Sequence, residues 1–189
     1  MNPTKLESDF KKICNKKMNL PLKYERLLNF YGIKIGDKHL GVGYYDVDNN
    51  VEKKLLKTFI HPNARKHFHI SLMVINHSYI PPHIDNDLKI VINFYVKTAN
   101  ATTYFWRPKT DSVSTIKLEM QTDGILFKEE ELECVGEFKA EEYDLWMLDV
   151  SKIHSVRCVE EGSLRIAFCF QSTTLNFEEV MTNIDQIIL

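Results

Sequence analysis

The sequence predicts a mainly β protein of the α+β class, in which a sandwich, jelly roll or barrel of short strands has helices packed against it. From residue 66 onward, apolar and polar residues mostly alternate with a period of two. Aromatic and β-branched runs are separated by polar turns without intervening helical repeats, which disfavours a doubly wound α/β sheet. With 189 residues, 44% of them hydrophobic, the chain is expected to form a single domain over 1–189.

Two helices are predicted near the N-terminus. The first is predicted because the apolar residues of 6–14 recur on one helical face. Thr4 and Glu7 have the spacing of a capping box at its start. The second would cover 22–31, where the apolar residues again form a stripe and Gly32 follows as a stop signal.

A strand over 38–47 and a third helix over 51–59 are expected to complete a helical N-terminal part, 1–60. A short C-terminal helix is predicted over 176–184. Between them, about eight strands are expected to form a β-core over about 66–172: HFHISLMVI, LKIVINFYV, TTYFWR, VSTIKLEM, ECVGEF, DLWMLDV, HSVRCV and LRIAFCFQ.

Composition excludes several classes of protein. With Lys+Arg 24 against Asp+Glu 26 and a net charge of -2, binding to duplex nucleic acid is disfavoured. No run approaches the roughly 18 to 20 apolar residues of a membrane span, and the N-terminus lacks the apolar region of a signal peptide. A cytoplasmic location is therefore expected. The 4 cysteines form no CxxC pair and are too few for a disulfide framework, so reduced thiols are expected.

The segment Pro81-Pro82-His83-Ile84-Asp85 is the most informative one for chemistry. On an extended strand, His83 and Asp85 project from the same side and can share one metal ion. With the distant His154 they have the chemistry of a 2-His-1-carboxylate triad, which leaves positions on Fe(II) open for a chelating co-substrate and dioxygen. The guanidinium of Arg165 can clamp the far carboxylate of a chelating dicarboxylate.

These residues stand in a particular order: HxD after a double proline, a hydrophobic strand, a WMLD strand, His-Ser-Val, and an arginine that opens another apolar strand. In this order the chain resembles the Fe(II)/2-oxoglutarate-dependent dioxygenase superfamily, over roughly 68–171. PPHIDNDLKIVINFYV is similar to its metal-binding turn, and YDLWMLDVSKIHSVRCVEEGSLRIAFCFQ to the end of its core. The resemblance is nearest to small stand-alone members, including aspartyl/asparaginyl-hydroxylase-like and phage-encoded proteins.

The resemblance implies a double-stranded β-helix (jelly roll) and an oxygenase that hydroxylates an unidentified substrate with Fe(II), 2-oxoglutarate and dioxygen. His83, Asp85 and His154 would form the catalytic metal centre, and Arg165 would bind the distal carboxylate of 2-oxoglutarate. Further co-substrate contacts are expected from polar residues on neighbouring strands: Asn93, Tyr95 and Tyr104.

Two departures from the family pattern leave the subfamily open. Some members place Ser or Thr two residues after the arginine, where this chain has Ala167, and a Gly-Gly-x-Thr element is replaced by the stretch from Asn100 to Phe105. A second histidine pair, His67 and His69, is interpreted as polar residues on one strand face. The alternative function is a non-catalytic jelly-roll module, binding or structural, that retains a divalent metal site. Neither the primary substrate nor the oligomeric state follows from the sequence.

Overall fold

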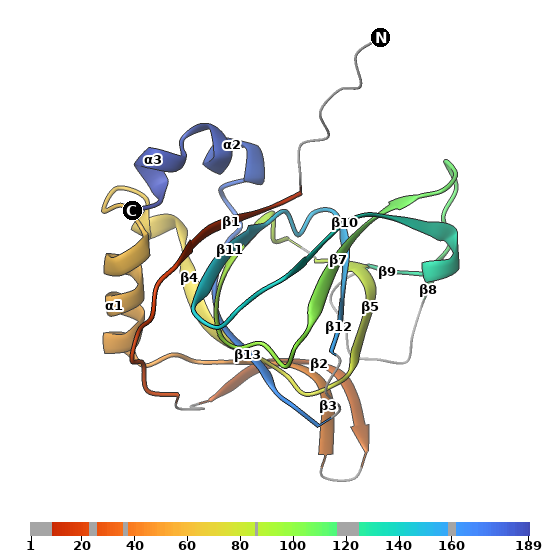
Figure 1. Ribbon diagram of the computed structural model, residues 1–189, viewed down its shortest axis with the longest axis horizontal. Helices are drawn as coiled ribbons and strands as arrows, with labels where there is room; N and C mark the ends of the chain where they lie inside the picture. The colour runs from red at the N-terminus through yellow and green to blue at the C-terminus, as the bar shows by residue number, and fades with distance from the viewer. Residues whose placement is uncertain (1–8, 23–25, 36–37, 86, 117–124, 159–161) are drawn as a thin grey trace.

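The computed structural model describes residues 9–22, 26–35, 38–85, 87–116, 125–158 and 162–189 (Figure 1). These residues form two antiparallel β-sheets with few helices. The prediction of a mostly β protein is confirmed. No helix of the described part is long and apolar enough to cross a membrane.

The first sheet has 7 strands in the order β1-β11-β6-β13-β4-β3-β2. Their bounds in that order are Phe10–Asn15, Asp144–Leu148, Ile90–Lys97, Arg165–Ser172, His69–Ile75, Lys38–Tyr45 and Leu27–Ile35. The second sheet has 6 strands in the order β10-β7-β12-β5-β9-β8. Their bounds are Leu132–Lys139, Thr102–Pro108, Ile153–Arg157, Tyr79–Ile84, Ile125–Phe127 and Thr115–Ile116.

The three α-helices lie on the side of the seven-stranded sheet that faces away from the six-stranded sheet (Figure 1). The predicted third helix is confirmed as α1 (Asn49–Phe59), in which the Asp48 side chain accepts hydrogen bonds from the first backbone N–H groups. The predicted C-terminal helix is present as two short ones, α2 (Phe177–Thr182) and α3 (Ile184–Ile187). Two 3-10 helices complete the set: η1 (Arg65–His67) and η2 (Glu129–Glu131).

The seven-stranded sheet is buried on both faces at its centre. One face packs against α1 and α2, for example through Leu55, Phe94 and Phe168. The other face packs against the six-stranded sheet, for example through Tyr95 and Phe105. Strands β4, β6 and β13 therefore read as nearly continuous apolar runs, because both of their faces are buried.

The helix predicted over 6–14 is wrong for the described residues, because Phe10–Asn15 forms the edge strand β1 paired with β11. The register of this pair shifts between Lys12 and Cys14. Phe10 therefore packs between the sheets, whereas Ile13 and Cys14 pack on the helix side. A bulged strand that serves two cores thus produces the spacing that imitates a helical stripe.

The helix predicted over 22–31 is also wrong where the structure describes it, because Leu27–Ile35 is the edge strand β2. Its hairpin partner β3 supplies the backbone hydrogen bonds, which outweigh local helix propensity. Leu27 and Leu28, which belong to the apolar stripe of the predicted helix, are 41% and 40% exposed. Residues 1–8 and 23–25, also part of the two predicted helices, lie outside the described residues.

Besides β1 and β2, two strands within the predicted β-core were not predicted. Strand β5 contains Pro81 and Pro82, which lack a backbone N–H, and β9 has only three residues. The strand predicted over 113–120 is described only as β8 (Thr115–Ile116), because 117–124 lie outside the described residues.

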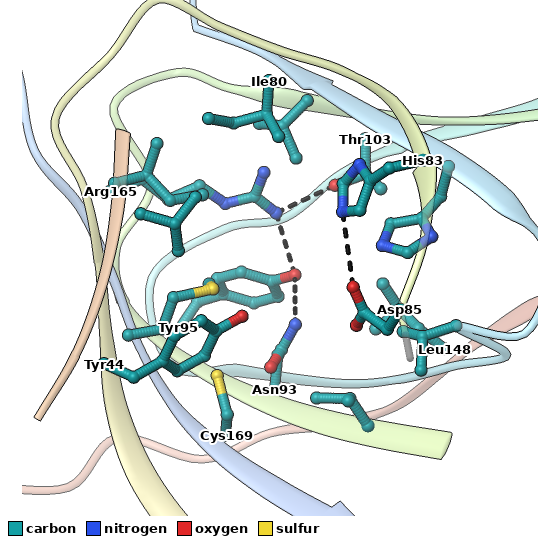
Figure 2. A pocket seen from close by; sticks show the side chains of 17 residues that line it. Tyr44, Ile80, His83, Asp85, Asn93, Tyr95, Thr103, Leu148, Arg165 and Cys169 are labelled. Atoms are coloured by element: carbon teal, nitrogen blue, oxygen red, sulfur yellow. Dashed lines mark hydrogen bonds and ion pairs between the residues drawn. The ribbon is translucent and has the colours of Figure 1, made fainter. Parts of the chain in front are cut away.

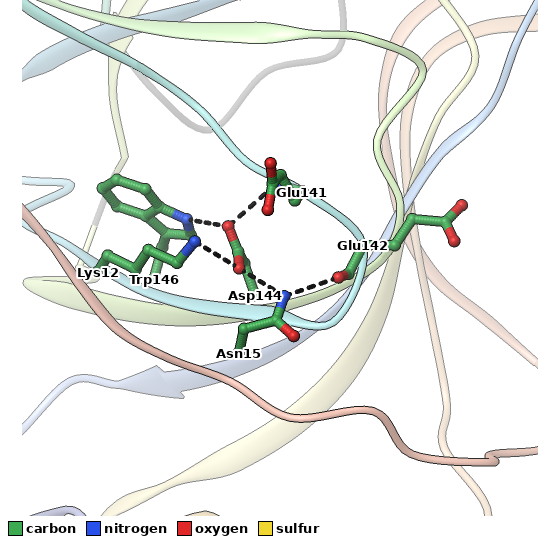
Figure 3. A network of polar contacts seen from close by, with 6 residues as sticks. All are labelled: Lys12, Asn15, Glu141, Glu142, Asp144 and Trp146. Atoms are coloured by element: carbon green, nitrogen blue, oxygen red, sulfur yellow. Dashed lines mark hydrogen bonds and ion pairs between the residues drawn. The ribbon is translucent and has the colours of Figure 1, made fainter.

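A fully buried carboxylate, Asp144, joins the edge strand β1 to β11 (Figure 3). It accepts hydrogen bonds from four donors: Lys12 Nζ (2.8 Å), Asn15 Nδ2 (2.8 Å), the Glu141 backbone N–H (3.0 Å) and Trp146 Nε1 (3.1 Å). Burial acts to raise the pKa of Asp144, but these donors together hold it below the ordinary 3.8. The carboxylate therefore stabilises the fold as an anion.

We expect Asp144→Asn to lower the free energy of unfolding by about 3 kcal/mol at pH 7, because the new amide NH₂ would face buried donors. Since the folded-state pKa lies below 3.8, the contribution of the carboxylate is complete above that pH and is lost as the pH falls through the folded-state pKa. Urea denaturation at pH 7 and at successively lower pH should show the difference between wild type and variant shrinking below about pH 4. The exposed neighbour Glu142 provides the control, and Glu142→Gln should change stability by less than about 0.5 kcal/mol. A difference that is the same at all pH values would contradict this role.

Candidate metal and carboxylate site

His83 lies on β5 opposite His154 on β12, and both side chains face the space between the sheets. The register of the two strands shifts between this pair and the pair Ile80 and Val156, so β5 carries one extra residue. Pro81 and Pro82 occupy this bulge, where a missing backbone N–H is tolerated. The imidazole centroids are 4.3 Å apart.

Both imidazoles are held by the same local contact. Nδ1 of His83 lies 2.8 Å from the Pro81 carbonyl oxygen, and Nδ1 of His154 lies 3.0 Å from the Lys152 carbonyl oxygen. A carbonyl oxygen only accepts hydrogen bonds, so each Nδ1 carries the proton and each Nε2 presents its lone pair. This is the tautomer of a histidine that binds a metal through Nε2.

Asp85 follows β5 and completes the group. Its Oδ1 lies 3.5 Å from Nε2 of His83 (Figure 2), and its backbone N–H donates to the carbonyl of Val150 in the turn before β12. One potential ligand atom from each of His83, Asp85 and His154 lies within 4.8 Å of the others. Ligands at right angles on a metal with bonds of about 2.1 Å are about 3 Å apart, so small side-chain movements would complete coordination.

The protonation state of the buried histidine also suits a metal ligand. Burial, with a smaller effect from His83, lowers the pKa of His154 to about 4, although Asp85 opposes the shift. The imidazole is therefore neutral at pH 7, which is the form that coordinates a cation.

Arg165, the first residue of β13, is a buried cation facing the same cavity. It is 2% exposed, and its Nη2 donates to Tyr95 Oη at 2.8 Å and to Thr103 Oγ1 at 2.9 Å (Figure 2). The guanidinium carbon lies 4.8 Å from the centroid of the Tyr95 ring. Nη1 is buried and has no hydrogen-bond partner in the described structure. Both partners of Nη2 are neutral, so the buried positive charge is solvated but not neutralised by them.

Asn93 and Tyr95 extend this polar group along β6. Asn93 Nδ2 donates to Tyr95 Oη at 3.3 Å, and Asn93 Oδ1 is buried without a partner in the described structure. Tyr95 Oη therefore accepts two hydrogen bonds, and its own proton is left to donate elsewhere.

The rest of the cavity wall is largely apolar and comes from both sheets (Figure 2). It includes Tyr44 from β3, Ile80 from β5, Leu148 from β11 and the thiol of Cys169 from β13. Burial raises the pKa of Cys169, so this wall residue is an uncharged thiol. The low-polarity wall strengthens any electrostatic contact made inside the cavity.

The structure brings together six of the seven residues singled out in the sequence, and the seventh is Tyr104. Because side chains alternate along a strand, Tyr104 lies on the opposite face of β7 from the cavity. There its ring contacts the Arg157 guanidinium at 5.6 Å and the Trp106 ring at 5.8 Å. Its neighbour Thr103, which the sequence reasoning missed, faces the cavity and contacts Arg165. Only the register of β7 distinguishes these two neighbours.

Comparison with known proteins yields weak structural similarities. No protein-family model matches the chain, and no curated protein matches its sequence. Two structures of Escherichia coli YcfD, one described as a ribosomal oxygenase in complex with cobalt and 2-oxoglutarate, match with TM-scores of 0.41 and 0.42 at 12% identity. The matches cover 82% of this chain but only 40% and 38% of YcfD. SnoN, described as a non-heme alpha ketoglutarate dependent epimerase from nogalamycin biosynthesis, matches with a TM-score of 0.35 at 11% identity, over 68% of this chain and 58% of SnoN. These values do not assign a family, and the function proposed below rests on the geometry of the site.

Proposed function

We propose that the protein is an Fe(II)- and 2-oxoglutarate-dependent oxygenase that hydroxylates a substrate not yet identified. His83, Asp85 and His154 hold the iron, and Arg165 binds the distal carboxylate of 2-oxoglutarate. We further propose that the two sheets form a double-stranded β-helix as a single domain, with the site between the sheets.

One observation carries this proposal: a buried guanidinium with an unpartnered Nη1 faces the same cavity as a His-Asp-His group. An uncompensated buried charge is unfavourable, so the cavity is built to receive an anion. A His-Asp-His group takes a divalent cation and leaves coordination positions open. A ligand that binds both the guanidinium and the metal ion must have a carboxylate at one end and a chelating group at the other. 2-Oxoglutarate has both.

The surrounding residues have distinct roles in this arrangement. The free Nη1 of Arg165 and the free proton of Tyr95 point to two hydrogen bonds to one carboxylate. Thr103 fixes the guanidinium by accepting from Nη2. The unpartnered amide oxygen of Asn93 suits a bound water or a hydroxyl group.

When bound, Fe(II) and 2-oxoglutarate would supply the oxidising chemistry, in which 2-oxoglutarate is converted to succinate and carbon dioxide while dioxygen is consumed. The chain supplies placement and protection. The Pro81 and Lys152 carbonyls hold the two imidazoles with Nε2 available. The apolar wall limits the access of water to the reacting groups.

The proposal is tested by adding Fe(II) and 2-oxoglutarate to the protein without oxygen. We expect a metal-to-ligand charge-transfer absorption band that needs both additions, because only a chelated keto acid on the iron produces it. On exposure to air, succinate should then form. Absence of the band in the folded protein would refute the proposal. A band without succinate would instead favour the non-catalytic module that retains a metal site.

A further inference from the structure

A second polar cluster lies on β5 and β12, close to the candidate metal site but on the outer face of the six-stranded sheet. Arg157 is paired with Tyr79 across these two strands, just as His154 is paired with His83. Between the two pairs lie only the pair of Ile80 with Val156 and the bulge at the double proline. Whatever fixes the outer pair therefore also fixes the register on which the inner pair depends.

Glu129, from η2, links both members of the outer pair. Its Oε1 accepts a hydrogen bond from Nη2 of Arg157, and its Oε2 accepts one from Tyr79 Oη at 2.6 Å. The Arg157 guanidinium also lies 5.6 Å from the ring centroids of Tyr79 and Tyr104. One carboxylate thus bridges the first residue of β5 and the last residue of β12.

The charges of this cluster are matched. Burial acts to raise the pKa of Glu129, but the contacts from Tyr79 and Arg157 outweigh it and lower the pKa below its ordinary value. Burial, together with the hydrogen bond to Glu129, raises the pKa of Tyr79 to about 12. At neutral pH the cluster therefore consists of a carboxylate, a guanidinium and a phenol that donates its proton.

The chain around Glu129 holds β5 at its other end as well. Strand β9, which precedes η2, pairs with β5 through Leu126 opposite His83 and Ile125 opposite Ile84. In the ribbon, β9 lies beside β5 (Figure 1). The segment 125–129 therefore contacts β5 through the backbone at His83 and through the Glu129 side chain at Tyr79.

We propose that Glu129 is a positioning residue for the metal site. Its side chain holds β5 and β12 in the register that brings His83 and His154 together. This inference rests on the metal-binding step of the proposed function. Glu129 has no direct contact with the metal, and it acts through the strand pair that carries two of the three ligands.

The test is titration of the full chain with Co(II), a coloured substitute for Fe(II) whose absorption spectrum reports ligand geometry. We expect Glu129→Gln to weaken Co(II) binding about tenfold, in the range seen for residues that orient metal ligands, and to change the shape of the Co(II) spectrum. Tyr79→Phe removes only the hydroxyl and keeps the ring beside Arg157, so a smaller loss of about threefold is expected. If Glu129→Gln fails to fold, the Tyr79→Phe variant still tests the inference.

Two control variants separate positioning from general stability. Glu130→Gln removes a neighbouring exposed charge. Asp46→Asn removes the ion pair with Arg26 beside β2 and β3 of the other sheet, and the Asp46 side chain is about as exposed as that of Glu129. Both should bind Co(II) as tightly as the wild type and with the same spectrum. The inference is overturned if the wild type binds Co(II) and both variants, Glu129→Gln and Tyr79→Phe, bind it as tightly as the wild type and with the same spectrum. If wild type itself binds no divalent metal, the proposed function fails first.

Discussion

Asp85→Asn is expected to weaken divalent metal binding at least about 100-fold, because loss of even an outer contact to a metal ligand typically costs about 10- to 100-fold. The substitution keeps the shape of the side chain and removes the only negative charge of the His-Asp-His group. A neutral amide oxygen is a much weaker ligand for a divalent cation than a carboxylate. Isothermal titration with Co(II), or equilibrium competition with a chromophoric chelator, measures the change directly.

Asp87 provides a matched control two residues further along the chain. It is exposed and has a positive φ of 60°, a conformation that asparagine tolerates well, so Asp87→Asn removes the same charge without backbone strain. The metal affinity of the Asp87→Asn variant should stay within about twofold of that of the wild type if Asp85 acts as a direct ligand, because exposed charges are strongly screened. Equal losses in the two variants would show a general effect of negative charge and would argue against coordination by Asp85.

The β-rich part of the fold could be predicted because most of its strands carry a strong local signal. Strands β4, β6 and β13 are apolar runs bounded by polar turns, and α1 has both a cap and an amphipathic stripe. Strands β1 and β2 could not be predicted. Strand β1 forms at a sheet edge against β11, which is distant in the sequence, and β2 forms at the other edge, where pairing with β3 outweighs the local helical pattern. A bulge in β1 moreover gives the spacing of a helix.

The candidate site shows the same limit at the level of single residues. His83, Asp85, His154 and Arg165 were found because their types and order suggest metal and carboxylate chemistry. Thr103 was missed in favour of Tyr104, since the choice between neighbours on a strand depends on register, which is set by pairing across the sheet. Glu129 carries no motif, and its link to β5 and β12 exists only in the folded chain.

The proposed co-substrate role of Arg165 predicts that its substitution affects ligand binding and stability differently. Arg165→Met should weaken 2-oxoglutarate binding by at least about 30-fold, because loss of one partner of a buried charge pair costs about 2 kcal/mol or more. The same substitution should leave the stability of the ligand-free protein unchanged or raise it by about 1 to 3 kcal/mol, because methionine replaces an unneutralised buried cation with an apolar chain. Co(II) affinity should be retained, since Arg165 is not one of the three proposed metal ligands.

These two measurements separate a ligand-binding arginine from a structural one. An arginine that stabilises the fold through Tyr95 and Thr103 would make Arg165→Met less stable, and the loss of ligand binding would then follow from a damaged cavity. Arg165→Lys sharpens the distinction, because it keeps the charge and loses the two-pronged geometry. The affinity of Arg165→Lys for 2-oxoglutarate should lie between those of the wild type and Arg165→Met. In the ligand-free state Arg165→Lys should be the least stable of the three, because it buries a compact charge with fewer hydrogen-bond donors. Only a site whose positive charge is held in place for an anion makes the weakest binder, Arg165→Met, at least as stable as the wild type in the ligand-free state.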